Sequence, residues 1–408
     1  MKPAPRLGAI FLTVFIDLLG FGLVLPFLAK EARDTFGVSA FVATLLGSAY
    51  SLMQFLFVPV WGRVSDRVGR RPVLLWSIAG TALTMGGLGV ALTWGGSIAW
   101  LFAARIFGGI ATANLGTASA YIADITKPED RAKGMGLIGM AFGLGFILGP
   151  GIGGALARIP IDGRHGAVPC FVAAGLSVVN LAWVFTGVAE SLPPERRATV
   201  PRRKLAPLNV AAIRDAFALP GVGLAIAINF LVVLSFTNLD QTFTFFCSDV
   251  FGIDERGTGG VLAFIGIVAA GVQGGLVRRL SGKVDEALLM RAGALIQALA
   301  FAGFVLAATL DARAWLFASG ALLALGNGLT QPTTSAFISR RAAADAQGST
   351  LGANQSFASL ARTFGPALGG WLYANLGTRA PYSVAACGMV VAFALAMGLR
   401  KAQTPALT

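Results

Sequence analysis

The chain has 408 residues, of which 55% are hydrophobic and only 12% are charged, and its formal net charge is +13 at pH 7. Soluble globular proteins carry about 25% charged residues, so this composition excludes a soluble protein and indicates one that lies in a membrane. The positive charge does not indicate a nucleic-acid partner, because the basic residues lie at helix ends and in loops and form no basic, aromatic-rich domain.

Apolar stretches of about 20 residues, the length that crosses a bilayer, recur along the chain. In chain order they predict twelve membrane-spanning helices at residues 7–29, 40–61, 72–93, 97–122, 132–156, 167–189, 219–247, 257–277, 287–309, 314–338, 347–374 and 381–399. The predicted fold class is therefore all-α integral membrane. A polar break rich in Pro and Arg divides the spans six and six. It predicts a six-helix bundle at 1–189, a cytoplasmic linker at 190–218 and a second six-helix bundle at 219–408.

The distribution of Lys and Arg predicts the orientation of the spans, because cytoplasmic loops retain these residues. With the N-terminus inside, 23 of the 32 fall in cytoplasmic segments and seven in outer segments. Both termini are therefore predicted to be cytoplasmic, and contact with anionic membrane lipid accounts for the excess positive charge.

The residue types that carry most enzymatic chemistry are scarce. His165 is the single histidine, it falls in a predicted outer loop, and the three cysteines are not clustered. We therefore expect no metal site, no catalytic residues and no enzyme activity. The chain also lacks a phosphate-binding G-x-x-x-x-G-K-S/T loop, so we expect no cofactor and no direct drive by ATP.

Four ionisable side chains lie inside predicted spans: Asp17, Arg105, Asp240 and Arg362. A charge at bilayer depth costs on the order of 3 kcal/mol on insertion scales, so each needs a partner or a function. Charged residues at this depth are typical of transporters.

A short internal repeat supports the division into two halves. The sequence from Gly149 to Gly154, which includes Pro150, matches the sequence from Gly365 to Gly370 at an offset of 216 residues. Spans five and eleven are therefore predicted to be equivalent, as expected where substrate binds between two repeats near the middle of the membrane.

The segment between spans two and three reads GRVSDRVGRRP from Gly62 to Pro72. A short loop with one acid and several arginines can join two helix ends through charge-assisted hydrogen bonds, and its glycines permit close approach. The motif resembles the signature loop of the major facilitator superfamily. By this resemblance we expect a gating role for Gly62, Asp66, Arg67, Gly69, Arg70 and Arg71.

The superfamily resemblance spans nearly the whole chain, and a narrower one is to the twelve-helix tetracycline/proton antiporters. Span one (DLLGFGLVLP from Asp17) and span four (RIFGGI from Arg105) are similar to theirs. Span five resembles the antiporter motif that separates exporters from importers, here Gly145, Gly149, Pro150, Gly153 and Gly154. Gly145, Gly149 and Gly153 also recur every four residues, a spacing that predicts a flat face for close helix packing.

The antiporter resemblance implies that Asp17 carries the proton and that Arg105 tunes it. The alternative for the first two is a static ion pair between spans one and four. Asp240 departs from the pattern, and it can bind a proton, bind a cationic substrate or pair with Arg362. Arg362 can instead bind an anionic group.

Polar groups within the spans suit a substrate cavity lined by hydrogen-bonding side chains. The candidate substrate-binding residues are Gln54, Asn114, Asn238, Asp240, Gln241, Gln331, Gln355 and Arg362. We predict a proton-coupled antiporter that works as a monomer by alternating access in a bacterial inner membrane. Its expected partners are protons, membrane lipid and a hydrophobic or amphiphilic small molecule such as a tetracycline-like drug. The alternative is a transporter of a metabolite or a lipid-like amphiphile on the same fold.

Overall fold

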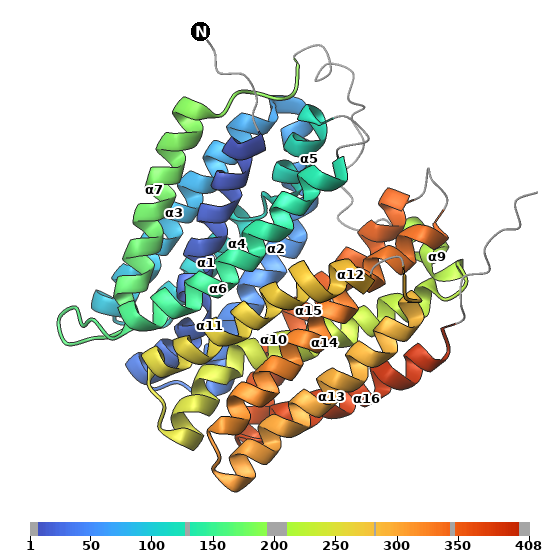
Figure 1. The fold of residues 1–408 in the computed structure, drawn as a ribbon. Helices are drawn as coiled ribbons and strands as arrows, with labels where there is room; N and C mark the ends of the chain where they lie inside the picture. The colour runs from blue at the N-terminus through green and yellow to red at the C-terminus, as the bar shows by residue number, and fades with distance from the viewer. Residues whose placement is uncertain (1–6, 127–130, 194–209, 281–282, 343–346, 400–408) are drawn as a thin grey trace, which may run out of the picture. The chain divides into compact units, whose positions relative to one another are not determined.

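The structure is a computed structural model that describes residues 7–126, 131–193, 210–280, 283–342 and 347–399. Within these ranges it is helical apart from turns and a single bridge between Ile161 and Arg164 (Figure 1). Eight of the described helices are long and apolar enough to cross a membrane. The all-helical membrane fold predicted from the sequence is confirmed.

The chain divides into two compact units, and the first unit comprises residues 1–207 together with 243–248 and 252–263. Its helices are α1 (Leu7–Phe36), α2 (Ala40–Val68), α3 (Arg70–Trp94), α4 (Ala99–Ala111), α5 (Leu115–Ile125), α6 (Arg131–Ala157) and α7 (Ala167–Gly187). α1 packs on α6 and α7, α2 packs on α4, and α3 packs on α4 and α7, as Figure 1 shows for α3 and α7. Apolar side chains of α1, α3, α5 and α7 form its core, among them Ile10, Leu74, Tyr121 and Val184.

The second unit comprises residues 208–242, 249–251 and 264–408. Its helices are α9 (Val210–Ala218), α10 (Val222–Phe251), α11 (Glu255–Gly271), the π-helix η2 (Val272–Val277), α12 (Arg278–Leu280), α13 (Glu286–Leu310), α14 (Ala314–Arg341), α15 (Gln347–Leu376) and α16 (Ala380–Met397). Residues 243–248 of α10 and the first turns of α11 belong to the first unit. α13 packs on both α14 and α16.

Several helices extend beyond their predicted ends. α1 reaches Phe36 rather than residue 29, and α2 reaches Val68 rather than residue 61. The polar residues in these extensions do not end the helices, because the backbone N–H and C=O groups stay hydrogen-bonded within the helical segment. The glycines that follow do end these helices, since Gly37 and Gly69 have φ of 65° and 108°.

Two predicted spans are not single α-helices. Span four is divided into α4 and α5 by a turn at residues 112–114, and span eight changes from α11 to the π-helix η2 at Val272. Broken helices at membrane depth are tolerated where neighbouring groups satisfy the freed backbone. The predicted linker at 190–218 contains α9, while its residues 194–209 lie outside the described ranges, so the domain boundaries stay a prediction.

The repeated Gly-Pro motif makes equivalent contacts in the two units. A Cβ added at Gly149 of α6 would lie 2.6 Å from the carbonyl carbon of Gly22 in α1. A Cβ at Gly369 of α15 would lie 3.1 Å from the carbonyl oxygen of Asn238 in α10. Gly22 and Asn238 are themselves 216 residues apart, which is the offset of the repeat. The fifth span of each half therefore packs closely on the first span of that half.

Candidate functional site

Asp17 lies in the middle of α1, and two neutral amide side chains hold its carboxylate. Asn114 Nδ2 donates to one carboxylate oxygen at 3.3 Å, and Asn180 Nδ2 donates to the other at 3.2 Å. Asn180, on α7, is fully buried and also donates to the carbonyl oxygen of Thr13 at 3.0 Å. Three helices thus converge on this carboxylate.

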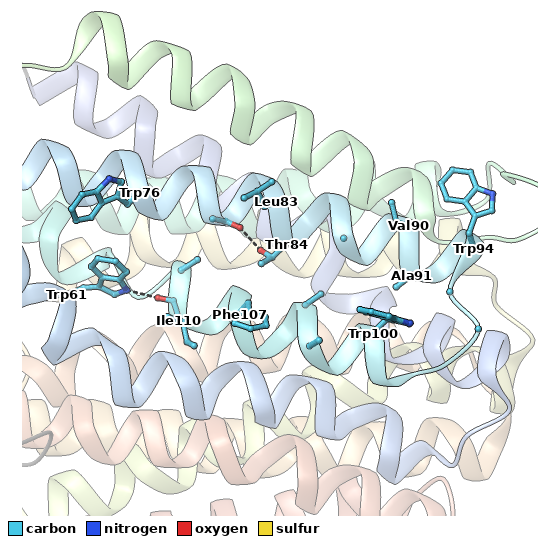
Figure 2. A pocket seen from close by; sticks show the side chains of 17 residues that line it. Trp61, Trp76, Leu83, Thr84, Val90, Ala91, Trp94, Trp100, Phe107 and Ile110 are labelled. Atoms are coloured by element: carbon cyan, nitrogen blue, oxygen red, sulfur yellow. Dashed lines mark hydrogen bonds between the residues drawn. The ribbon is translucent and has the colours of Figure 1, made fainter.

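The turn between α4 and α5 places Asn114 beside Asp17. Side chains from neighbouring helices donate to the carbonyl groups of Ile110 and Ala111, directly before the turn. Trp61 Nε1 donates to the Ile110 oxygen at 2.6 Å (Figure 2), and Ser77 Oγ donates to the Ala111 oxygen at 2.6 Å. A helix that is interrupted within an apolar span is typical of transporter binding sites.

Arg105 is 2% exposed and lies over an aromatic ring. Its guanidinium carbon is 4.0 Å from the centroid of the Tyr50 ring, and its Nε donates to the carbonyl oxygen of Leu46 at 3.3 Å. The Tyr50 hydroxyl lies 2.5 Å from Thr112 Oγ1, at the turn between α4 and α5. An aromatic face stabilises a desolvated cation, so the ring offsets part of the free energy that burial of this charge costs.

Asp17 and Arg105 do not form an ion pair in the first unit. The Asp17 carboxylate accepts from two amides, while Arg105 lies over an aromatic ring and donates to a carbonyl oxygen. Among the described residues, the static ion pair between spans one and four that was the alternative to a functional role is therefore not seen. The two charges are connected through the turn, where Thr112 contacts Tyr50 and Asn114 contacts Asp17.

Asp240 and Arg362 lie in the second unit, on α10 and α15. Gln241 Nε2 donates to Asp240 Oδ2 at 2.9 Å, and Arg362 donates to Ser359 Oγ at 2.9 Å. No ion pair joins Asp240 to Arg362, and within the described residues no carboxylate lies within ion-pair distance of Arg362. The pairing alternative is thus not seen.

The other predicted substrate-binding residues differ in burial. Asn238 and Gln241 are buried in α10, and Asn238 Nδ2 donates to the carbonyl oxygen of Pro381 at 2.9 Å. Gln54 and Gln331 are half-buried, whereas Gln355 is exposed. Their role in substrate binding stays a prediction.

The predicted gating loop is almost entirely helical, because α2 continues to Val68 and α3 begins at Arg70. Only Gly69 interrupts the helix, with a φ of 108° that side chains rarely adopt. A Cβ at Gly62 would meet no atom within 4 Å, so the predicted close approach at Gly62 is wrong. Arg67 is exposed, and Arg71 donates to the carbonyl oxygen of Phe185 at 2.5 Å.

Arg70 joins this helix end to α5 through charge-assisted hydrogen bonds. It donates to Asp66 at 2.5 Å, to Ser65 Oγ at 2.6 Å and to Asp124 at 3.2 Å. Glu190, just after α7, accepts from the backbone N–H groups of Arg70 and Arg71 at 2.9 and 3.2 Å. A carboxylate in this position caps the positive end of α3.

The glycines of the predicted antiporter motif pack α6 against α1, as their spacing predicts. A Cβ at Gly145 would lie 3.0 Å from the backbone of Leu18, and one at Gly153 would clash with the carbonyl oxygen of Leu23. Gly154 instead faces the first turn of α11, where a Cβ would lie 3.1 Å from the Cα of Gly259.

An apolar groove of about 800 Å³ runs between α3 and α4 (Figure 2). Four tryptophans stand at its two ends, Trp61 and Trp76 at one and Trp94 and Trp100 at the other. Leu83, between them, is 77% exposed, and Thr84 donates its hydroxyl to the carbonyl oxygen of Gly80 at 2.9 Å. The lining is thus predominantly apolar, and its aromatic ends are typical of a lipid-facing surface.

Comparisons with known proteins agree with one another. Residues 10–366 match the Major Facilitator Superfamily. The chain is 33% identical over 378 residues to the tetracycline resistance protein, class C, of Escherichia coli, an alignment that covers 92% of this chain and 91% of that protein. It is 30% identical over 466 residues to the major facilitator superfamily domain-containing protein 10 of Bos taurus, covering 100% and 95%. The crystal structure of the human organic anion transporter MFSD10 matches with a TM-score of 0.71 and 26% identity, covering 96% and 98%.

Proposed function

Because the chain belongs to the major facilitator superfamily, and is thus a multi-pass membrane transporter and not an enzyme, we propose that it exports a hydrophobic or amphiphilic small molecule in exchange for protons. The match to tetracycline resistance proteins supports a tetracycline-like drug as the substrate class. The predicted resemblance to that superfamily and to those proteins is confirmed.

The environment of Asp17 is the observation that supports proton coupling most directly. Its carboxylate accepts hydrogen bonds from two neutral amides and forms no ion pair with a cation of the described residues. Proton gain by Asp17 therefore breaks no ion pair, and either amide can rotate its oxygen toward a protonated carboxyl. A carboxyl that keeps good partners in both protonation states suits a reversible proton carrier.

Arg105 is proposed to act on Asp17 through the turn between α4 and α5. Its guanidinium stacks on Tyr50, whose hydroxyl contacts Thr112, two residues before the Asn114 amide that donates to Asp17. A shift of Tyr50 moves the turn, and the turn carries one of the two donors of the carboxylate. Substrate that displaces Tyr50 would in this way change how readily Asp17 holds its proton.

A second candidate substrate is an organic anion, and Arg362 is the observation that favours it. This side chain is half-buried in α15, donates to Ser359 Oγ and lies within ion-pair distance of no carboxylate among the described residues. A cation in these surroundings can bind an anionic group of a substrate. The human relative of known structure is an organic anion transporter, which supports this candidate over other metabolites or lipid-like amphiphiles.

The proposed setting follows from the distribution of charge. We place both termini on the cytoplasmic side of a bacterial inner membrane, with a monomer surrounded by lipid. The proton gradient supplies the energy, and the proposed cycle uses no cofactor. Within the second unit, Asp240, Gln241 and Asn238 are proposed to contact the substrate.

Transport in proteoliposomes tests this proposal. Vesicles that contain the purified protein are given a proton gradient, and the movement of a tetracycline and of a fluorescent organic anion is measured, each with wild type and with Arg362→Gln. Gradient-driven movement of the tetracycline that survives Arg362→Gln supports drug export. Movement of the anion that is lost in Arg362→Gln supports the second candidate. If neither compound moves with the gradient, proton-coupled export of these substrates is refuted.

A further inference from the structure

Glu31 is a second carboxyl on α1, about four turns from Asp17 and near the opposite end of the helix from the N-terminus. Its side chain is buried, with 5% of the residue exposed. The loop before α7 packs against it so closely that a Cβ at Gly166 would clash with Glu31 Cγ. Nothing in the proposed transport site uses this residue.

The nearest cation is already engaged with other carboxylates. The ammonium group of Lys30 lies 2.7 Å from Asp34 and 2.6 Å from Glu255 at the start of α11. Arg158, after α6, lies 3.1 Å from Asp254. In the described part of the chain, neither a hydrogen bond nor an ion pair reaches the Glu31 carboxyl, so it is a buried acid without a partner.

Glu31 also lines a cavity of about 610 Å³ at this end of the first unit. The charged and titratable groups that share the cavity come from α1, the loops that precede α7 and α11, and the start of α11: Lys30, Asp34, Arg158, Arg164, His165, Asp254 and Glu255. The Cys170 thiol on α7 donates to the carbonyl oxygen of Gly166, the residue that packs on Glu31, at 3.7 Å. The cavity gives water, and hence protons, a path to a carboxyl that is otherwise enclosed.

We propose that Glu31 is a proton-binding site, separate from Asp17, whose ionisation draws Lys30 away from Glu255. A buried carboxylate without a partner is unfavourable, so Glu31 is neutral while Lys30 is held by Asp34 and Glu255. Loss of the proton makes the Glu31 carboxyl an anion next to Lys30. Three carboxylates, rather than two, then attract the Lys30 ammonium group. The bond between α1 and α11 weakens as a result.

A proton fits this site better than a metal ion. The described residues contain no group of three His, Cys, Asp or Glu side chains arranged to hold a metal. The acids other than Glu31 are each bonded to Lys30 or Arg158, which leaves no set of free carboxylates for a divalent cation.

Infrared difference spectroscopy on the purified protein tests the protonation directly and needs no transport. The carboxylic acid band is compared between wild type and Glu31→Gln, which keeps the shape of the neutral acid. We expect wild type to show a protonated carboxyl at neutral pH that is missing in Glu31→Gln and disappears in wild type at alkaline pH. Glu31→Met serves as a second variant without an ionisable group, and identical wild-type and variant spectra would overturn the proposal.

The pH dependence of thermal stability tests the consequence for Lys30. We expect wild type to lose stability toward alkaline pH, while Glu31→Gln does not. Asp34→Asn removes a more exposed carboxylate that also bonds Lys30, and His165→Gln removes the only histidine; both are expected to behave like wild type. A Glu31→Gln profile that follows wild type refutes the coupling to Lys30.

The Glu31 proton site rests on the proposed proton coupling, and experiments can refute one of the two without the other. If Asp17→Asn abolishes gradient-driven transport while the infrared spectra show no protonated Glu31, only the second proton site is wrong. If Glu31 binds a proton and the protein shows no gradient-driven transport, the proposed function fails and the proton site stands.

Discussion

Because α6 packs closely on α1, a single methyl group added at Gly149 of α6 should destabilise the protein. A Cβ added at Gly149 would lie 2.6 Å from the Gly22 carbonyl carbon, which is 0.8 Å shorter than the 3.4 Å at which ordinary contacts begin. Both partners are backbone, so no side chain can rotate away and the two helices must separate. Such overpacking costs about 1–3 kcal/mol.

Gly143 provides the matched control on the same helix. A Cβ there would meet no atom within 4 Å, so Gly143→Ala should stabilise α6 by about 0.5–1 kcal/mol through its helix propensity. We therefore expect Gly149→Ala to melt at a lower temperature than wild type in detergent, and Gly143→Ala to melt at the same or a higher temperature. Equal melting temperatures for the two variants would refute the close approach of α6 to α1.

Three further predictions concern the buried charges and the helix end. Tyr50→Phe removes the hydroxyl that contacts Thr112 but keeps the ring under Arg105, so it should cost about 1 kcal/mol in a thermal unfolding assay, whereas Tyr50→Leu should cost more. Arg105→Lys should reduce transport at least tenfold in proteoliposomes, since a compact ammonium cannot both stack on the ring and reach Leu46; normal transport would contradict the proposed role. Glu190→Gln should lower stability by about 1 kcal/mol, because a neutral amide caps α3 less well, and an unchanged melting temperature would argue against that cap.

The sequence predicts the fold and the deep charges because both depend on hydropathy. Asp17 and Arg105 stand out as ionisable residues within apolar spans, and the structure places both inside the first unit. The repeat of the Gly-Pro motif likewise predicts equivalent helices, since glycine at every fourth position leaves a face on which another backbone can lie.

The partners of these charges were not predictable from the sequence. Asn180 contacts Asp17 across 163 residues, and a lone amide in an apolar span has no spacing that identifies its partner. The turn at Thr112 contains neither Pro nor Gly, and donors from Trp61 and Ser77 on other helices support it. Thr112 and Asn114, two polar residues separated by Ala113 within span four, were the available signal. Glu190 could have been noticed as an acid directly after span six.

The gating motif shows how a correct family resemblance can give a wrong local structure. Charged residues between two spans suggest a loop, yet α2 and α3 continue through them and leave only Gly69 outside a helix. The arginines therefore act from helix ends, where Arg70 can reach Asp66 one turn earlier and Asp124 on another helix.

The measurement that tests proton-coupled export most directly is a comparison of two transport modes in Asp17→Asn. Proteoliposomes containing wild type or the variant are assayed for gradient-driven transport and for substrate exchange without a gradient. The account predicts that Asp17→Asn loses gradient-driven transport and keeps exchange. The amide oxygen of the variant side chain still accepts a hydrogen bond, but the amide cannot gain or lose a proton during the cycle. Gradient-driven transport at the wild-type rate in Asp17→Asn would contradict the account.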